Sequence, residues 1–316
     1  MEFLNTLLEK YQVRKTKKQK TAFLEWACAE MEKMGYAPRV EEHKDLFNCR
    51  NLIAGNPEEA KVIFTAHYDT PPVMPIPNIV FPQNSLLTLG VQLPLIAVMF
   101  FMCFGVRVLA DAIGGENAML SFVLMEVGLL AVVFGFLGLL FFGPANRHNA
   151  NDNTSGTACL MEMMARLAPE ERAHAAFIFF DQEEKGKVGS LAFAKKYPVL
   201  KKNGFVFNLD CIGDGKHMMI VAPKKADTAQ MEMLGCLFPE NEDFTCQVTT
   251  ARKANYNSDQ RSFRHGYAMA ALHRHPKLGL HLNKIHTSRD TVCDEKNIQY
   301  VMDGCLRLLK QKAEEN

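Results

Sequence analysis

Two long apolar segments constrain this chain more than any other feature. Residues 86–106 carry no charged side chain, and residues 118–143 carry only Glu126. Each is long enough to cross a hydrocarbon core, which needs about 20 apolar residues. A buried hairpin in a soluble core is the alternative, but core helices are usually shorter and amphipathic. We expect a transmembrane hairpin of two helices with a polar tip at residues 110–117 and both flanking parts on one side of the membrane.

Outside the hairpin, short apolar runs of strand type end in polar residues. Helical patterns occupy residues 157–168 and 190–197, and they alternate with the runs along the chain. Alternation of this kind indicates an α/β sheet with polar residues gathered at the carboxyl ends of its strands. The three apolar runs, each with its polar end, are residues 61–67, 175–181 and 204–210.

The N-terminal part is basic but does not resemble a secretory signal. Residues 1–35 have the spacing of an amphipathic helix, and the segment from Lys10 to Lys20 holds six Lys or Arg residues and no acid. We interpret this cluster as a solvated helix face, with contact to anionic lipid as the alternative. Because no apolar run precedes the basic cluster, we expect the catalytic part on the cytoplasmic side of the membrane.

Charge and cysteine content exclude several classes of protein. Lys and Arg number 36 against 35 Asp and Glu, so no overall field favours nucleic acid as a partner. The nine cysteines are scattered without a CxxC pair. They predict neither a disulfide framework nor a thiolate zinc site, and they favour a reducing compartment. Nothing in the sequence indicates an oligomeric state.

Imidazoles and carboxylates recur where the predicted strands and turns end. A single His or Asp at a strand end is more often a hydrogen-bonded or capping residue, but five such places in order are harder to dismiss. Donors of this kind suit zinc or a similar ion, and the excess of carboxylates suits two ions that share one of them. The set comprises His67, Asp69, Asp152, Glu183, Glu184, Asp210 and His286.

The motifs around these residues resemble those of the co-catalytic di-zinc aminopeptidases. That family includes bacterial leucine aminopeptidases and, more distantly, glutamate carboxypeptidase-like enzymes and glutaminyl cyclases. The resemblance covers roughly residues 50–70 and 145–300. It implies a three-layer α/β/α fold with a central mixed sheet, here interrupted by the inserted hairpin. The motifs are His67-x-Asp69, Asp152-Asn153, Glu183-Glu184 before Gly189-Ser190, Asn208-Leu209-Asp210, and His286-Thr287 with Asp290-Thr291.

The resemblance also implies a complete set of ligands for two Zn²⁺ ions per chain. Asp152 would bridge the ions. His67 and Asp210 would complete one site, and Glu184 and His286 would complete the other.

Two further residues take catalytic roles by the same resemblance. Glu183 would be the general base that removes a proton from the water between the metals. Asp69 would accept the second ring N–H of His67 and fix its tautomer. The peptide bond after the bridging aspartate is commonly cis in this family, so we expect a cis bond between Asp152 and Asn153.

Residues 255–263 resemble the family segment that lines the substrate pocket. Tyr256, Ser258 and Asp259 are therefore candidates for contact with a peptide or aminoacyl substrate, with an ordinary turn as the alternative.

In typical members a short loop joins the first two ligands, whereas here His67 and Asp152 lie 85 positions apart. We expect residues 1–80 and 145–316 to form one discontinuous metallopeptidase domain. Residues 85–143 would be an insert that contacts membrane lipid.

These observations predict a membrane-anchored zinc aminopeptidase that hydrolyses N-terminal peptide bonds. Two alternatives are open. A glutaminyl cyclase-like acyltransferase would keep the fold but use one zinc ion, and a catalytically silent scaffold would use the hairpin to bind a membrane partner. About two metal ions per chain would favour the peptidase, one the cyclase and none the scaffold.

Overall fold

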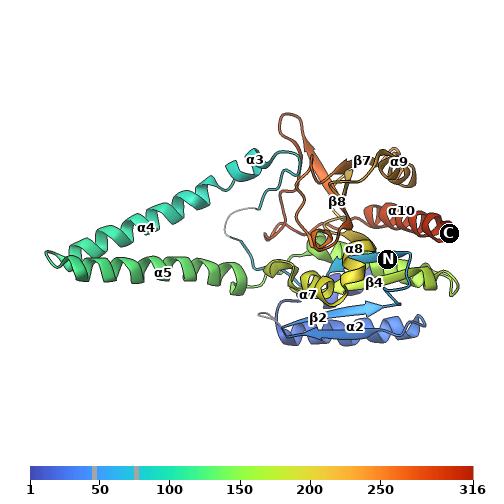
Figure 1. Cartoon of the computed structure of the whole chain (residues 1–316), viewed down its shortest axis with the longest axis horizontal. Helices are drawn as coiled ribbons and strands as arrows, with labels where there is room; N and C mark the ends of the chain where they lie inside the picture. The colour runs from blue at the N-terminus through green and yellow to red at the C-terminus, as the bar shows by residue number, and fades with distance from the viewer. Residues whose placement is uncertain (45–47, 75–77, 316) are drawn as a thin grey trace.

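The centre of the molecule is one nine-stranded mixed sheet (Figure 1). The computed structural model describes residues 1–44, 48–74 and 78–315. The strand order is β1-β2-β4-β3-β5-β8-β6-β7, with β9 paired to β8. The strands are β1 (Arg39–His43), β2 (Cys49–Ala54), β3 (Val62–His67), β4 (Ala175–Phe180), β5 (Phe205–Leu209), β6 (His217–Ala222), β7 (Thr245–Thr250), β8 (His265–His275) and β9 (Gly279–His281).

Three central strands bring polar residues to one edge of the sheet. β3 pairs in parallel with β4 on one side and with β5 on the other, so the carboxyl ends of all three strands point the same way. β2 and β6 run antiparallel to their central neighbours β4 and β8, which makes the sheet mixed, as expected. The three predicted strands are confirmed, and each is followed by polar residues as expected. Residues far apart in sequence therefore meet at this edge.

Helices cover both faces of the sheet because successive strand residues point to opposite sides. Phe64 and Phe207 pack on one face, beneath five helices. Ile63 and Val206, next to them in the same strands, pack on the other face against two helices. The first group is α1 (Glu2–Lys10), α2 (Lys17–Lys33), α6 (Gly156–Arg166), α9 (Thr228–Leu237) and α10 (Glu295–Glu314), and the second is α7 (Val188–Lys196) and α8 (Pro198–Asn203).

The N-terminal region departs from the prediction in two ways. Two helices, α1 and α2, replace the single expected one, because Thr16 caps the start of α2. The Thr16 hydroxyl accepts from Gln19 N–H, and the Gln19 side chain accepts from Thr16 N–H. The basic cluster is not simply a solvated face. Arg14 is fully buried and Lys20 is 4% exposed, because each satisfies polar groups inside the domain.

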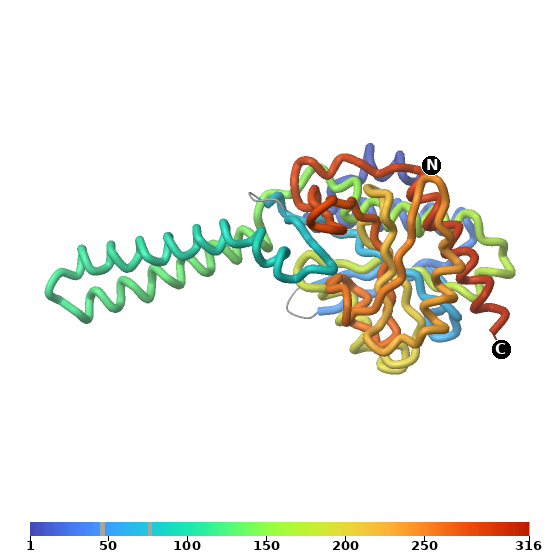
Figure 2. The backbone as a smooth tube through the Cα atoms, turned by 90° about the horizontal axis from the view of Figure 1, so that it is seen from above, coloured from blue at the N-terminus to red at the C-terminus, as the bar shows by residue number. Residues whose placement is uncertain are grey.

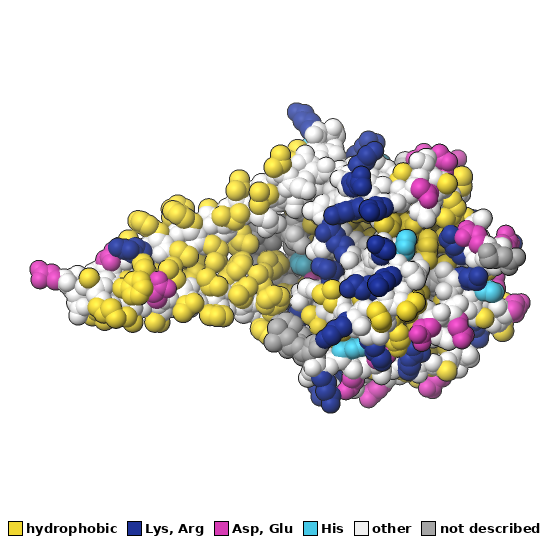
Figure 3. All heavy atoms as spheres, viewed as in Figure 1, with side chains coloured by type: hydrophobic (Ala, Val, Ile, Leu, Met, Phe, Trp, Pro, Cys, Tyr) yellow, Lys and Arg dark blue, Asp and Glu magenta, His cyan; other side chains and the backbone are white. Residues whose placement is uncertain are grey.

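The two apolar segments form a pair of long helices that project from the sheet domain (Figures 1 and 2). After the short α3 (Ser85–Gly90), α4 spans Leu93–Gly114 and α5 spans Ala118–Phe142. Their apolar side chains face outward, as Figure 3 shows, and the most apolar windows of the two segments are 6% and 0% buried. The polar tip is shorter than the predicted 110–117, since α4 continues to Gly114. By length and composition both helices are candidates for membrane spans.

The main chain before and after the long segment comes together at residues 71–73 and 144–146, and between these points Val80 also pairs with Leu282. The N–H of Val73 donates to Pro144 O at 2.8 Å, and the N–H of Asn146 donates to Pro71 O at 3.0 Å. Strands β1–β3 come before this point and β4–β9 after it, yet all belong to the same sheet. The long segment is therefore an excursion between β3 and α6 that leaves strand pairing uninterrupted.

Candidate metal centre

Asp152 lies between two histidines at the carboxyl edge of the sheet. Its Oδ1 is 3.3 Å from Nε2 of His67, the last residue of β3. Its Oδ2 is 3.0 Å from Nε2 of His286. The irregular segment Ala150–Ser155 carries Asp152, is buried throughout and contains the expected cis peptide between Asp152 and Asn153. Each oxygen of this one carboxylate thus faces a different imidazole.

Two three-residue groups meet at Asp152. His67, Asp152 and Asp210 form the first, with Asp210 Oδ1 at 3.6 Å from His67 Nε2. Asp152, Glu184 and His286 form the second, with Glu184 Oε2 at 3.3 Å from His286 Nε2. In each group, one potential ligand atom per residue lies within 4.8 Å of the others. All five predicted ligands are therefore brought together, in the two sets that the resemblance implies.

Asp69 positions the two glutamates. Its carboxylate accepts hydrogen bonds from the main-chain N–H of Glu183 at 2.9 Å and of Glu184 at 3.3 Å. Oδ1 of Asp69 lies 3.6 Å from His67 Nδ1, too far for a hydrogen bond, whereas the main-chain oxygen of Asp69 lies at 3.2 Å from the same nitrogen. The main chain of Asp69 thus contacts the imidazole, and its side chain fixes the turn that presents Glu183 and Glu184.

The electrostatics of the cluster suit a bound cation. Burial raises the pKa of Glu184 well above its ordinary value, and the Asp152 carboxylate adds to this effect. Burial lowers the pKa of His67, but the carboxylates of Asp152 and Asp210 outweigh burial and hold that pKa well above its ordinary value. Buried carboxylates brought this close together are unfavourable without compensating positive charge. Glu184 Oε1 is also buried without a hydrogen-bond partner in the described chain. The donor set fits zinc, which binds imidazole and carboxylate.

Asp290 supports the cluster in a way that the sequence did not reveal. Its Oδ1 accepts from the N–H of Asn151 at 2.8 Å, and its Oδ2 accepts from the N–H of Asp152 at 3.0 Å. Burial, with the nearby Asp152 carboxylate, raises the pKa of Asp290 to about 7. The only sequence signal for this role was that Asp290 follows His286 in the motif at residues 286–291. A motif does not show which main-chain N–H groups a carboxylate accepts from.

Two basic residues of the N-terminal cluster also reach the site. Arg14 donates from Nη2 to the Thr154 hydroxyl at 3.1 Å and from Nε to the carbonyl oxygen of Tyr68. Lys20 forms a buried ion pair with Asp181, which follows β4. Both residues tie the loops that carry the candidate ligands to the N-terminal segment. Sequence reasoning did not separate Arg14 and Lys20 from their exposed neighbours, because all six cations lie in one run of basic residues.

The three substrate candidates are buried beside the cluster. The Tyr256 hydroxyl donates to the main-chain oxygen of Asp210 at 3.1 Å, and the Ser258 hydroxyl accepts from Asn208 Nδ2 at 3.0 Å. Asp259 is fully buried, and neither of its carboxylate oxygens has a hydrogen-bond partner within the described residues. Contact of any of the three with substrate stays a prediction.

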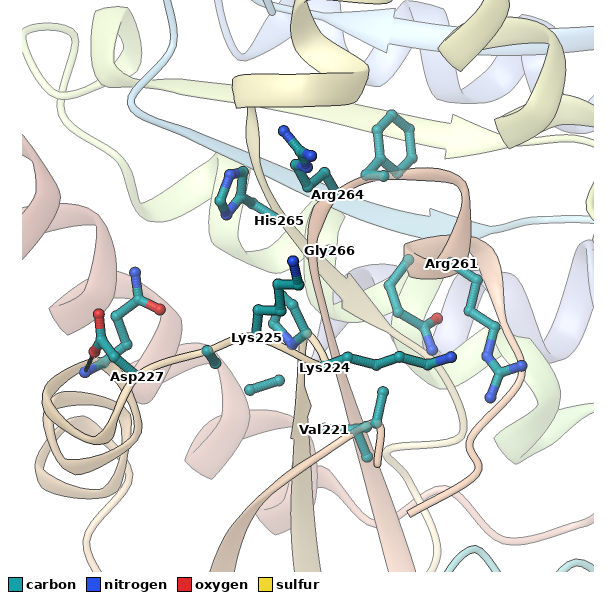
Figure 4. Close-up of a pocket in the computed structure, with 15 residues that line it drawn as sticks. Val221, Lys224, Lys225, Asp227, Arg261, Arg264, His265 and Gly266 are labelled. Atoms are coloured by element: carbon teal, nitrogen blue, oxygen red, sulfur yellow. Dashed lines mark hydrogen bonds between the residues drawn. The ribbon is translucent and has the colours of Figure 1, made fainter. Parts of the chain in front are cut away.

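Two cavities differ in their relation to the candidate ligands. One, of about 410 Å³, is lined by Glu184 and His286. A larger one, of about 730 Å³, lies at the start of α9 and is lined by the cationic residues Lys224, Lys225, Arg261 and Arg264 (Figure 4). None of the described residues that line the larger cavity is a candidate ligand. We therefore assign the chemistry of the cluster to the smaller cavity.

The mixed sheet and the set of imidazoles and carboxylates at its edge define a protein of the metallopeptidase class. The chain belongs to peptidase family M28, whose family model matches residues 138–309, more than half of the chain. The recognised resemblance to zinc aminopeptidase-like proteins is thereby confirmed. No curated protein sequence matches the chain significantly.

Solved structures share the fold at low sequence identity. A Zn-dependent exopeptidase from Parabacteroides distasonis superposes with a TM-score of 0.61 at 15% identity, covering 98% of this chain and 95% of that one. The LapA aminopeptidase of Legionella pneumophila gives 0.58 at 14% identity, covering 99% and 71%. Glutaminyl cyclase from Porphyromonas gingivalis gives 0.61 at 15% identity, covering 98% and 96%. Peptidases and a cyclase therefore superpose about equally well.

Proposed function

We propose that this chain is a two-zinc aminopeptidase that is anchored in a membrane by α4 and α5. The position of Asp152 carries the proposal, because its two oxygens face His67 and His286 separately, at 3.3 Å and 3.0 Å. Asp210 would complete one zinc site and Glu184 the other. A carboxylate shared in this way suits two cations better than one.

Glu183 is the residue we assign to proton transfer. One oxygen of its carboxylate lies within 4.8 Å of potential ligand atoms of His67 and Glu184, and burial raises the pKa of Glu183 well above its ordinary value. A carboxylate of raised pKa takes up a proton and returns it to a leaving amine more readily than an ordinary one. Asp69 holds the main chain of Glu183 through a hydrogen bond of 2.9 Å, so the base has a fixed position. Zinc, when bound, would polarise the scissile carbonyl and activate water.

The membrane part of the proposal rests on the exposed apolar surface of α4 and α5. Helices of 22 and 25 residues are about 33 and 37 Å long at 1.5 Å per residue, which exceeds a hydrocarbon core of about 30 Å. Such a surface would be unfavourable in water. We place the catalytic part on the cytoplasmic side. Cys236 is exposed, so its alkylation by an impermeant reagent in intact cells would contradict that placement.

The test combines metal content with hydrolysis by the full-length protein in detergent. Free and N-blocked aminoacyl amides are assayed before chelation, after chelation and after the return of zinc. We expect about two zinc ions per chain and hydrolysis of free termini only, lost on chelation and restored by zinc. Glu183→Gln should bind both ions but lower kcat by about 10²–10⁴-fold. The matched control Glu170→Gln, at an exposed position, should behave as wild type. Two bound zinc ions with no hydrolysis would reject the proposed reaction.

Glutaminyl cyclase activity is the second candidate, because the cyclase from P. gingivalis superposes as well as the exopeptidase does. A cyclase releases ammonia from an N-terminal glutamine, whereas a peptidase releases a free amino acid. Assay of ammonia and of free glutamine from one glutaminyl peptide separates the two reactions. About one zinc ion per chain with ammonia release would favour the cyclase.

A further inference from the structure

One cavity joins the base of the projecting helices to the candidate metal centre. Leu95 of α4 and Phe136 and Leu140 of α5 line one part of this 410 Å³ space, and Glu184 and His286 line another. Its volume falls within the range of about 300–1,000 Å³ that is typical of small-molecule sites. Helices that we propose to anchor the protein therefore also contribute a wall to the site. The other described lining residues are Pro72, Met74, Asn78, Gln92 and Phe141.

The two helices α4 and α5 separate as they approach the domain (Figure 1), and the space lies between their bases. Near the tip they are in close contact: a Cβ atom at Gly128 would lie 2.5 Å from Val106 Cγ1, and one at Gly114 would meet Ser121. Nearer the domain, a Cβ atom at Gly135 or Gly138 would meet nothing within 4 Å. Gly114 and Gly128 thus lie at close contacts between the helices toward the tip, and Figure 1 shows the two helices apart where they approach the domain.

The chemistry of the lining predicts what the cavity accepts. Leu95, Phe136 and Leu140 offer only apolar surface, which disfavours a charged side chain unless it is paired. Glu184 and His286 are candidate zinc ligands, so a group in the cavity would lie next to the bond that is cleaved. A bulky apolar side chain satisfies both conditions, since its burial against such a wall is favourable.

We propose that Leu95, Phe136 and Leu140 determine specificity, and that the enzyme prefers peptides with a bulky apolar residue beside the scissile bond. This inference rests on the proposed peptidase function. It assigns to the inserted helices a second task, the recognition of substrate, in addition to anchoring. Truncation of one of these three residues then removes contacts with a large apolar side chain of the substrate, but not with a substrate alanine.

Helix α5 provides matched variants for the test. Phe136→Ala is compared with Phe134→Ala, and Leu140→Ala with Leu139→Ala. Phe134 and Leu139 are 66% and 64% exposed on the same helix and do not line the cavity. Leucyl, phenylalanyl and alanyl p-nitroanilides are assayed with the zinc-loaded full chain. We expect Phe136→Ala and Leu140→Ala to lower kcat/KM at least about tenfold for the leucyl and phenylalanyl substrates and less than about threefold for the alanyl one, mainly through KM.

Binding provides a readout that does not depend on turnover. Calorimetric titration of leucinamide and alaninamide into Glu183→Gln protein should show tighter binding of leucinamide, and adding Phe136→Ala should remove the difference. An equal loss of kcat/KM for all three anilides would overturn the proposal. So would an equal effect of Phe134→Ala and Phe136→Ala on kcat/KM. If zinc-loaded wild type hydrolyses no anilide, the peptidase function fails, and the amide titrations still decide the role of the cavity. Equal binding of the two amides would reject that role.

Discussion

Asp290 accepts a hydrogen bond from the main-chain N–H of Asp152 at 3.0 Å. It thereby fixes the residue whose two oxygens face both histidines of the candidate metal centre. Support of this kind commonly contributes 10–100-fold to metal affinity, although Asp290 itself does not belong to either group of potential ligands.

Replacement of Asp290 should therefore weaken zinc binding. In Asp290→Asn, one acceptor oxygen becomes an NH₂ group that cannot accept from a main-chain N–H, so the bridging carboxylate loses its fixed position. We expect zinc affinity to fall by about 10–100-fold, measured by competition with a chelating dye. Asp294→Asn, at an exposed position nearby, serves as the control. Unchanged affinity in Asp290→Asn would show that the loop holds its shape without this carboxylate.

The buried ion pair between Lys20 and Asp181 should be costly to break. Their side chains are 5% and 2% exposed, so Lys20→Met leaves an unpaired carboxylate in the interior. We expect a loss of about 3–5 kcal/mol of unfolding free energy, measured by denaturant titration in detergent. Lys17→Met, at an exposed position, should change stability by less than about 0.5 kcal/mol. Adding Asp181→Leu to Lys20→Met should recover part of the loss; no recovery would indicate that Asp181 matters through its hydrogen bond to Arg50 N–H instead.

Asp214 should make stability depend on pH in the acid range. Burial raises its pKa, but His273 at 3.1 Å and Lys284 at 2.7 Å outweigh burial and hold the pKa below its ordinary value. Because the folded pKa is depressed, this carboxylate stabilises the fold above the unfolded pKa of about 3.9, and the contribution disappears as pH falls through the folded pKa.

The corresponding experiment compares wild type with Asp214→Asn in denaturant at pH 6 and at about pH 3. The wild type should be more stable at pH 6 by up to about 1 kcal/mol, since its partners are partly in solvent, and this advantage should shrink at the acid end. Asp243→Asn, which breaks an exposed pair with Lys296, should show a smaller difference. An advantage that is constant with pH would contradict the assignment.

Close packing of the projecting helices should depend on Gly128. A Cβ atom there would lie 2.5 Å from Val106 Cγ1, whereas one at Gly135 would meet nothing within 4 Å. We expect Gly128→Leu to destabilise the helical pair by about 1–3 kcal/mol through overpacking, seen as a lower melting temperature by circular dichroism in detergent. Gly135→Leu should melt as wild type. Equal melting of both variants would show that the two helices do not pack as the structure has them.

The central strands and the ligand cluster were predictable because each rests on local pattern. An apolar run that ends in His67 or Asp210 indicates both a strand and its functional edge, and the edge then collects residues from distant parts of the chain. Arg14 and Lys20 were not predictable, because nothing local separates a buried cation from its exposed neighbours. The break between α1 and α2 was missed although the Thr16 and Gln19 pair is a recognisable capping box.

The cavity at the base of α4 and α5 lay beyond sequence reasoning for another reason. Leu95 and Phe136 are indistinguishable in sequence from the outward-facing residues beside them, such as Leu93 and Phe134. The position of each side chain relative to the cavity, and not its type, decides which apolar residues face the metal centre.

The main-chain pairing of Pro71 and Val73 with Asn146 and Pro144 has a consequence for how such a chain can arise. The two ends of the segment of some seventy residues between these points lie side by side, and within it Val80 and Pro82 also pair with main-chain groups of Leu282 and Asn255 in the sheet domain. The entropic cost of closing a loop grows slowly, by about 0.6 kcal/mol for each doubling of length. Insertion of two long apolar helices between such adjacent ends therefore leaves the strand pairing of the sheet domain intact and adds little loop-closure cost to its folding.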